Sequence, residues 1–326
     1  MRAPLSQYRY STHLLVGLSA ATCATLALTG QAPVRDLAVL WVMAGVLSAD
    51  IWALVSRFRL DGGARVKAYA ICWPLLAHWL CFVRSYVAVP SSAEGLAAAA
   101  WPMVPITLLA LVMLAMSLWQ QPDSIGRQLT MGLIIGLVST VMPHVALWLV
   151  TLPAASYYMR SWSDRGIMSS LTGAVVAVWM VYCAVFFVAS PSAAHAMLSH
   201  YGSIVLEPRL SLLTAASPAS WRAYVVLTGL LLLVYSLSGL AVEVGQSVRA
   251  QASIQLVSVL GLMMLALALL FPASAAASLS TLPLLLAVQL TIHQANITTA
   301  LNEWWTVAIV VASAALCLAP TFTSAI

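Results

Sequence analysis

The sequence predicts an all-α fold, a polytopic transmembrane helix bundle with about 11 membrane segments. Of its 326 residues, 62% are hydrophobic and 7% are charged, and the mean hydropathy is +0.97. Soluble domains carry roughly 25% charged residues, so a chain this poor in charge needs lipid as its solvent. Backbone amides in lipid must pair internally, which leaves helices or closed barrels. The apolar runs are long and continuous, which favours helices over short alternating strands.

Each helical span needs about 20 apolar residues. The stretches of that kind are 13–30, 37–56, 68–89, 96–119, 166–189, 221–242, 253–273, 280–299 and 303–319. The first resembles a signal peptide because Arg2 and Arg9 precede it, but the many spans that follow favour an uncleaved first helix. We expect residues 1–326 to form a single integral membrane domain.

One further apolar stretch, residues 128–159, is too long for a single span. Pro143 lies near its middle, and proline removes a helical hydrogen bond and clashes with the preceding turn. We therefore expect a hairpin of two short helices, 128–142 and 144–159, which either crosses the membrane fully or re-enters. Within it, Gly132 and Gly136 form a GxxxG motif, which indicates close helix packing.

The cationic residues indicate the orientation, because cytoplasmic loops carry an excess of Lys and Arg. With the N-terminus in the cytoplasm, most of them fall inside, namely Arg2, Arg9, Arg57, Arg59, Arg65, Lys67, Arg127, Arg160, Arg165 and Arg249. Outside lie Arg35, Arg209 and Arg222, while Arg84 falls within a span. Because Arg127 and Arg160 flank 128–159, that stretch must return to the side where it began. We expect a bacterial inner-membrane protein with a cytoplasmic N-terminus.

Only one extramembrane segment, the external loop 190–220, is long enough to form a cap. The external candidates for chemistry are Asp36, His195, His200, Glu207 and Arg209. His195 and His200 with Glu207 nearby give a weak metal signal that lacks a third convincing ligand, so we expect no metal site. The five cysteines all lie in apolar segments and are expected to be packing residues.

Polar side chains within the spans are costly in lipid and need partners or a wet cavity. The candidates are Asp50, His78, Arg84, His144, Gln289, His293 and Asn296. Asp50 and His78 differ by only about 6 Å in depth, so they could meet as a proton-relay or ligand-binding pair. The alternative is that the Arg84 guanidinium extends to the external membrane interface while Asp50 is hydrogen-bonded near the cytoplasmic interface.

A polar stripe follows the tenth segment, where Gln289, His293 and Asn296 share one helical face. Such a stripe should face the bundle interior, where it could line a cavity for a polar head group or solute. The alternative is that the helix leaves the membrane after Ile292. His144 follows the Pro143 break, where freed carbonyl groups need partners, so a structural role is expected.

Several enzyme signatures are missing from the sequence, namely an aspartate-rich diphosphate-metal motif, HExxH, GxSxG and a P-loop. We expect no cofactor. The net charge of +5 comes from scattered loop residues rather than a basic patch interleaved with aromatics, so we expect no nucleic-acid partner. The expected partners are the lipid bilayer and, as alternatives, other membrane proteins or a lipid-linked glycan.

Two parts of the sequence resemble a bacterial protein family. The first is the stretch Gly132–Ser139 followed by Pro143, Met159-Arg160 and Gly173, and the second runs from Pro283 to Glu303-Trp304-Trp305. That family comprises polytopic membrane proteins of the Bacteroidetes phylum catalogued as a domain of unknown function. The resemblance implies an inner-membrane location and supplies no activity. The same glycine–proline–arginine stretch is loosely similar to multispan glycosyltransferases and polymerases that use polyprenyl-linked sugars. Those enzymes place a catalytic acid in a large first external loop. Here the expected first external loop is only residues 31–36, and Asp36 is its only acidic residue.

Three functional hypotheses follow. The first is an inner-membrane protein without assignable biochemical activity that serves in envelope assembly or as an interaction component. The second is an envelope glycan enzyme with a polyprenyl-linked donor, with Asp36 and the 190–220 loop near its site. The third is a small-solute or lipid transporter with Asp50, His78, Gln289 and His293 lining a mid-depth cavity. A scaffold predicts instead that these polar groups satisfy one another in a packed bundle.

Overall fold

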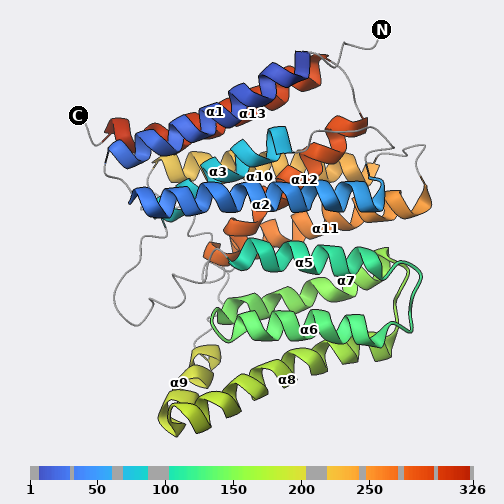
Figure 1. Cartoon of the computed structure of the whole chain (residues 1–326). Coiled ribbons are helices and arrows are strands. Elements are labelled where there is room, and N and C mark those ends of the chain that lie inside the picture. Colours follow the sequence, from blue (N-terminus) through green and yellow to red (C-terminus); the bar gives the residue numbers. More distant parts are fainter. Residues whose placement is uncertain are drawn as a thin grey trace. The chain divides into compact units, whose positions relative to one another are not determined.

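A computed structural model describes residues 7–29, 33–60, 69–86, 103–202, 219–241, 247–270, 275–296 and 300–323 (Figure 1). These residues form helices and no strands, so the all-α prediction is confirmed for the described part of the chain. Four helices are long and apolar enough to cross a membrane: Val34–Arg57, Asp164–Val188, Arg222–Ala241 and Val248–Leu269. Shorter apolar helices accompany them, and the figure of about 11 segments stays a prediction.

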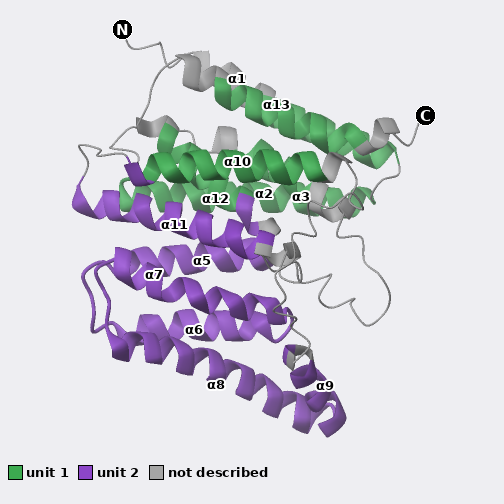
Figure 2. Cartoon of the chain, turned by 180° about the vertical axis from the view of Figure 1, so that it is seen from behind, with its two compact units in different colours: residues 1–88, 215–239, 283–326 green, residues 89–214, 240–282 purple. Residues whose placement is uncertain are grey.

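The chain divides into two compact units, coloured separately in Figure 2. Unit 1 comprises residues 1–88, 215–239 and 283–326, and unit 2 comprises residues 89–214 and 240–282. The expectation of one integral membrane domain over residues 1–326 stays a prediction.

Unit 1 is built around α3 (Tyr69–Tyr86), whose central side chains are almost completely buried. The helices around it are α1 (Gln7–Leu28), α2 (Val34–Phe58), α13 (Ala300–Thr323) and most of α10 (Ala219–Ala241) and α12 (Ala275–Asn296). Helices α1, α2 and α13 pack directly on α3. Trp73 fixes the α2 contact, because its Nε1 donates to the Trp41 carbonyl at 3.0 Å while its ring covers Gly45. The Trp79 ring packs against the Tyr224 ring of α10 at 4.2 Å between centroids, with the two planes tilted by 30°.

Unit 2 contains the expected hairpin. Helix α5 (Met103–Ser117) leads into α6 (Ile125–Ser139), and the chain returns through the 3₁₀ helix η1 (Pro143–Val150) and α7 (Thr151–Tyr158). The break at Pro143 is confirmed, since α6 ends before it and Pro143 begins η1. The return limb was expected as one short helix, but its first half is 3₁₀. Gln120 N donates to Met159 O at 2.9 Å, so both ends of the hairpin meet at one end of unit 2.

Helices α8 (Asp164–Val188), α9 (Pro191–Gly202) and α11 (Val248–Leu270) complete unit 2. Helix α8 packs closely on α6, and three glycines at the contact leave no room for a Cβ. A Cβ on Gly132 would overlap the Ser170 carbonyl, one on Gly136 would lie 2.8 Å from Ala174 Cα, and one on Gly173 would lie 3.0 Å from Leu133 N. The GxxxG motif therefore packs helices closely, as the sequence predicted.

The segment 190–220 is not wholly a loop, because its first part forms α9. Ser190 caps this helix: its Oγ accepts a hydrogen bond from Ala193 N at 3.1 Å, and Pro191 occupies the first helical position, where its missing N–H costs nothing. Residues 203–218 lie outside the described residues.

Candidate functional site

Buried polar side chains of unit 1 are hydrogen-bonded to one another across helices. Gln289 Nε2 of α12 donates to Ser236 Oγ of α10 at 2.8 Å, and His78 Nδ1 of α3 lies 3.0 Å from Ser313 Oγ of α13. Interhelical hydrogen bonds of this kind hold membrane helices together because lipid offers no competing donor or acceptor. These polar pairs between helices of unit 1 therefore form the candidate site.

Two of the three candidate residues of the α12 stripe face α10. Gln289 is buried against Ser236, and the His293 ring meets the Tyr235 ring edge-on at 5.1 Å between centroids. Asn296 ends α12, and its side chain lies outside the described residues. The stripe therefore contacts a neighbouring helix at the two positions that the structure describes.

Asp50 and His78 do not form the pair that their similar depths allowed. His78 is fully buried, with Nδ1 against Ser313 and Nε2 without a hydrogen-bond partner. Asp50 is exposed on α2, and no described residue forms a hydrogen bond or ion pair with it. Depth fixes only the position of a residue along the helix, and the two side chains point in different directions around their helix axes. Arg84 lies on α3, and its side chain is outside the described residues.

Thiols also line the interior of unit 1. Cys23 Sγ of α1 lies 3.4 Å from Cys81 Sγ of α3, and Cys72 Sγ lies 3.1 Å from Thr291 Oγ1 of α12. Sequence reasoning treated the cysteines only as packing residues and missed these contacts. A signal was available, because the expected topology places Cys23 and Cys81 in the external halves of two spans that run in the same direction.

The external candidates that the structure describes are not assembled into a site. Asp36 is half-buried in the first turn of α2, where the helix dipole stabilises a carboxylate. His195 is exposed on α9, with its ring 6.0 Å from that of Tyr182 in α8. The side chain of His200 and all of Glu207 and Arg209 lie outside the described residues. Among the described residues, no group of three or more His, Cys, Asp or Glu side chains is arranged to hold a metal ion.

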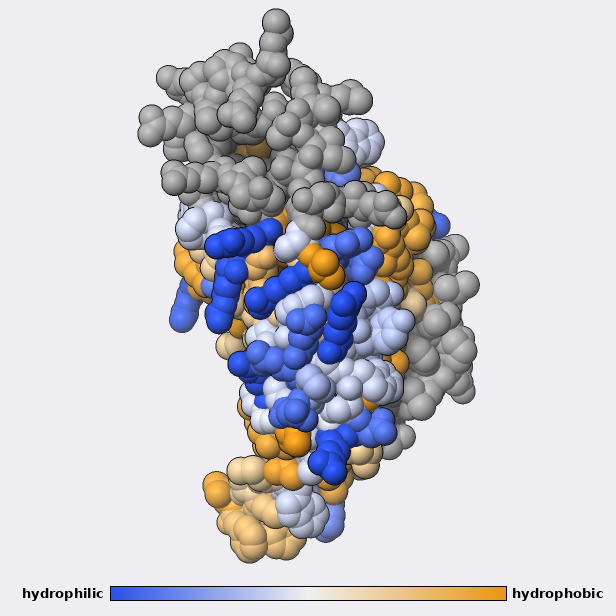
Figure 3. All heavy atoms as spheres, turned by 90° about the vertical axis from the view of Figure 1, so that its right-hand side faces the viewer, coloured by the Kyte–Doolittle hydropathy of each residue, from blue (hydrophilic) through white to orange (hydrophobic). Residues whose placement is uncertain are grey.

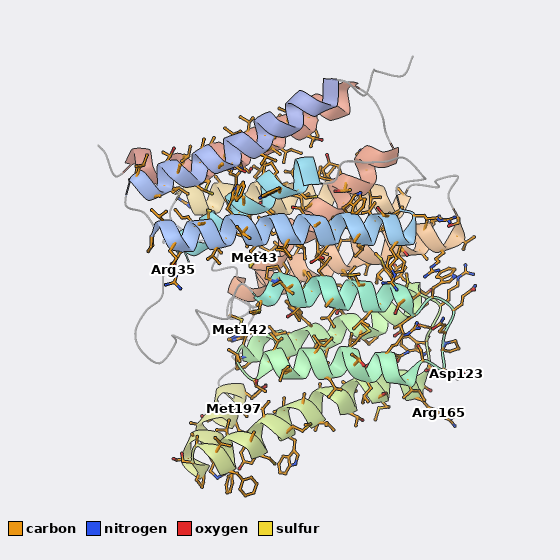
Figure 4. The ribbon with its side chains drawn as sticks, in the orientation of Figure 1. Arg35, Met43, Asp123, Met142, Arg165 and Met197 are labelled. Atoms are coloured by element: carbon orange, nitrogen blue, oxygen red, sulfur yellow. The ribbon has the colours of Figure 1, made fainter. Side chains whose placement is uncertain are left out.

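Unit 2 has two chemically different ends. Asp123 and Arg165 lie at one end and Met142 and Met197 at the other (Figure 4). At the first end, Arg127 Nη1 donates to Gln121 Oε1 at 2.6 Å and the Arg160 guanidinium lies 5.6 Å from the centre of the Trp119 ring. Figure 3 faces this end and shows hydrophilic side chains gathered there.

The opposite end of unit 2 carries a polar link from the hairpin to α9. Ser139 Oγ of α6 and Tyr201 Oη lie 2.9 Å apart. Burial raises the pKa of the Tyr201 phenol, and the hydrogen bond to Ser139 partly opposes that rise. His144 is half-buried beside the hairpin turn, in η1. Among the described contacts, neither residue has a titratable partner.

Apolar helices with buried polar pairs are characteristic of a membrane protein, and this much the structure supports directly. Comparison with protein-family models, with curated proteins and with solved structures found no match for this chain.

Proposed function

We propose that this chain is a multi-pass protein of the bacterial inner membrane that acts as a non-catalytic interaction component, with its cytoplasmic end at the arginine-rich end of unit 2. The observation that carries the proposal is the pairing of intramembrane polar groups with one another. The transport hypothesis needs His78 and Gln289 in a cavity, and here each is hydrogen-bonded to a serine of a neighbouring helix, His78 to Ser313 and Gln289 to Ser236. The proposed kinship with the Bacteroidetes family agrees with an inner-membrane location.

The positions of the arginines support the proposed orientation. Arg127 and Arg160 were assigned to the same side by counting, and the hydrogen bond between Gln120 and Met159 brings their two loops together at one end of unit 2. Cationic residues are retained on the cytoplasmic side during insertion. The external end would then carry α9 and the hairpin turn.

The glycan-enzyme alternative has less support from the described residues. It needs an acid in an accessible external position, and Asp36 is half-buried in the first turn of a helix. A carboxylate at that position stabilises the helix N-terminus, which explains its presence without chemistry.

Cysteine accessibility tests the proposal against a transport function. Single cysteines replace Ser236 or Ser313 in a variant whose five native cysteines are changed to Ala or Ser, and a membrane-impermeant thiol reagent is added from each side of the membrane. We expect both positions to remain unreactive, because each hydroxyl is buried between helices. A cysteine in place of exposed Gln121 provides the reactive control. Modification at position 236 or 313 would indicate a water-filled cavity and would overturn the proposal.

A further inference from the structure

Asp50 is an acid on a helix long and apolar enough to cross a membrane, and its side chain is exposed. Among the described residues, no side chain forms a hydrogen bond or ion pair with it. Seven residues separate it from Arg57, which places it about 10 Å from the end of a span about 36 Å long. Because the hydrocarbon layer is about 30 Å thick, Asp50 lies about 7 Å inside it. Acids at such depth are rare and pair with other groups.

The surface around Asp50 has the pattern of a helix-docking seam. Exposed side chains recur along α2 at alternating intervals of three and four residues, the repeat of a coiled-coil contact. We define the Asp50 face as Val39, Val42, Val46, Ala49, Asp50 and Ala53. Ala49 and Ala53 form a small-xxx-small pair, which lets a second backbone approach closely, directly beside the carboxylate.

The exposed face of α8 provides a contrast within the same chain. Val175 is 69% exposed and Trp179 is 61% exposed, and bulky apolar side chains of this kind are suited to lipid. That face has no ionisable side chain near its middle. Lipid therefore satisfies the α8 face completely, whereas it leaves the Asp50 carboxylate unpaired.

We propose that the Asp50 face docks a transmembrane helix of another protein that carries a Lys or Arg at the depth of Asp50. The inference rests on the proposed function, because it names the kind of partner that an interaction component would hold. Charge selects this occupant over a second copy of the chain. A two-fold symmetric contact through this face would bring two Asp50 carboxylates together in lipid, where like charges repel strongly.

Photo-crosslinking in living cells tests this inference on the full-length chain. A photoreactive phenylalanine derivative is placed at Val46 or Ala53, and at Val175 of α8 as the matched control. We expect one discrete adduct from positions 46 and 53 and none from 175. The adduct partner, identified by mass spectrometry, should contain a Lys or Arg within a membrane span. An adduct with a second copy of this chain, or no adduct, would overturn the inference.

Charge variants then test the role of Asp50 itself. We expect Asp50→Asn to lower the adduct yield about tenfold, equivalent to a loss of about 1.4 kcal/mol, and Asp50→Glu to keep it. Asp50→Lys should abolish the adduct, and exchanging the partner's cation for Asp should restore it. Because Asp50 is exposed and pairs with none of the described residues, gel filtration of a fluorescent fusion should show all three variants folded. A yield that Asp50→Asn does not change would overturn the inference.

The two proposals fail in different experiments. A reactive cysteine at position 236 or 313 would overturn the proposed function whatever the crosslinking result. Unreactive cysteines together with crosslinking that is insensitive to Asp50 would leave the proposed function in place and reject only the assignment of the Asp50 face.

Discussion

Replacing Gly132 with alanine tests the close packing of α6 on α8. The added Cβ would overlap the Ser170 carbonyl oxygen and lie 3.0 Å from Ser170 Cα. Both atoms belong to the backbone of α8, so no side-chain rotation can relieve the overlap. The helices must move apart along the seam that also contains Gly136 and Gly173.

The expected size of the effect follows from two opposing contributions. Exchanging Gly for Ala within a helix stabilises it by about 1 kcal/mol, while overpacking a tight interior costs about 1–3 kcal/mol. Because the overlap involves backbone, the cost should lie at the upper end, and we expect Gly132→Ala to lower the free energy of unfolding by about 1–2 kcal/mol. Gly126 is the matched control on the same helix, since a Cβ there meets nothing within 4 Å. We expect Gly126→Ala to be neutral or stabilising.

The assay is reversible unfolding of the purified protein in mixed detergent micelles, followed by circular dichroism. The Gly132→Ala variant should unfold at a lower denaturant fraction than the wild type, and Gly126→Ala at the same or a higher one. A Gly132→Ala protein as stable as Gly126→Ala would refute the close approach of α6 and α8.

Three further predictions follow from single contacts. Ser236→Ala should lower the free energy of unfolding by about 0.6–2 kcal/mol because Gln289 Nε2 loses this acceptor. Ser238→Ala should change it little, because the Ser238 hydroxyl donates to the Tyr235 carbonyl of its own helix. Equal effects of the two substitutions would contradict the α10–α12 pairing. Mild oxidation of membranes should form a disulfide between Cys23 and Cys81. The disulfide is detected because the two fragments stay linked after cleavage at a protease site inserted between α2 and α3. Half-buried Cys183 should stay free, and a disulfide through Cys183 instead would count against the α1–α3 contact. Cysteines that replace the exposed residues Gln121 and Ser199 should react with impermeant thiol reagents from opposite sides of the membrane. The cysteine at position 121 should react from the cytoplasmic side. Labelling of both positions from the same side would rule out the proposed topology.

Features that depend on local sequence, such as helix breaks and the spacing of small residues, could be predicted well. The break at Pro143 and the return of residues 128–159 follow from the chemistry of proline and from the arginines at both ends. The close contact at Gly132 and Gly136 follows from their spacing. The helix α9 was missed, although Ser190 followed by Pro191 is a helix-start signal.

Contacts that depend on rotation about helix axes could not be predicted. Asp50 and His78 have similar depths, yet His78 points to Ser313 and Asp50 points outward. The partners of Gln289 and Cys72, namely Ser236 and Thr291, are small hydroxyls without any pattern that distinguishes them from others in the chain. Helix order and mutual rotation decide such pairings, and apolar composition constrains neither.

The 3₁₀ geometry of η1 affects whether the hairpin is long enough to traverse lipid. Sixteen residues wound entirely as α-helix would extend about 24 Å, short of the roughly 30 Å of hydrocarbon. The eight residues of η1 rise about 2 Å each, so η1 and the eight residues of α7 together reach about 28 Å. The 3₁₀ winding thus lengthens this limb by about 4 Å and brings its reach to within about 2 Å of the hydrocarbon thickness. An insertion that restored α-helical winding here would also have to add residues to keep the same reach.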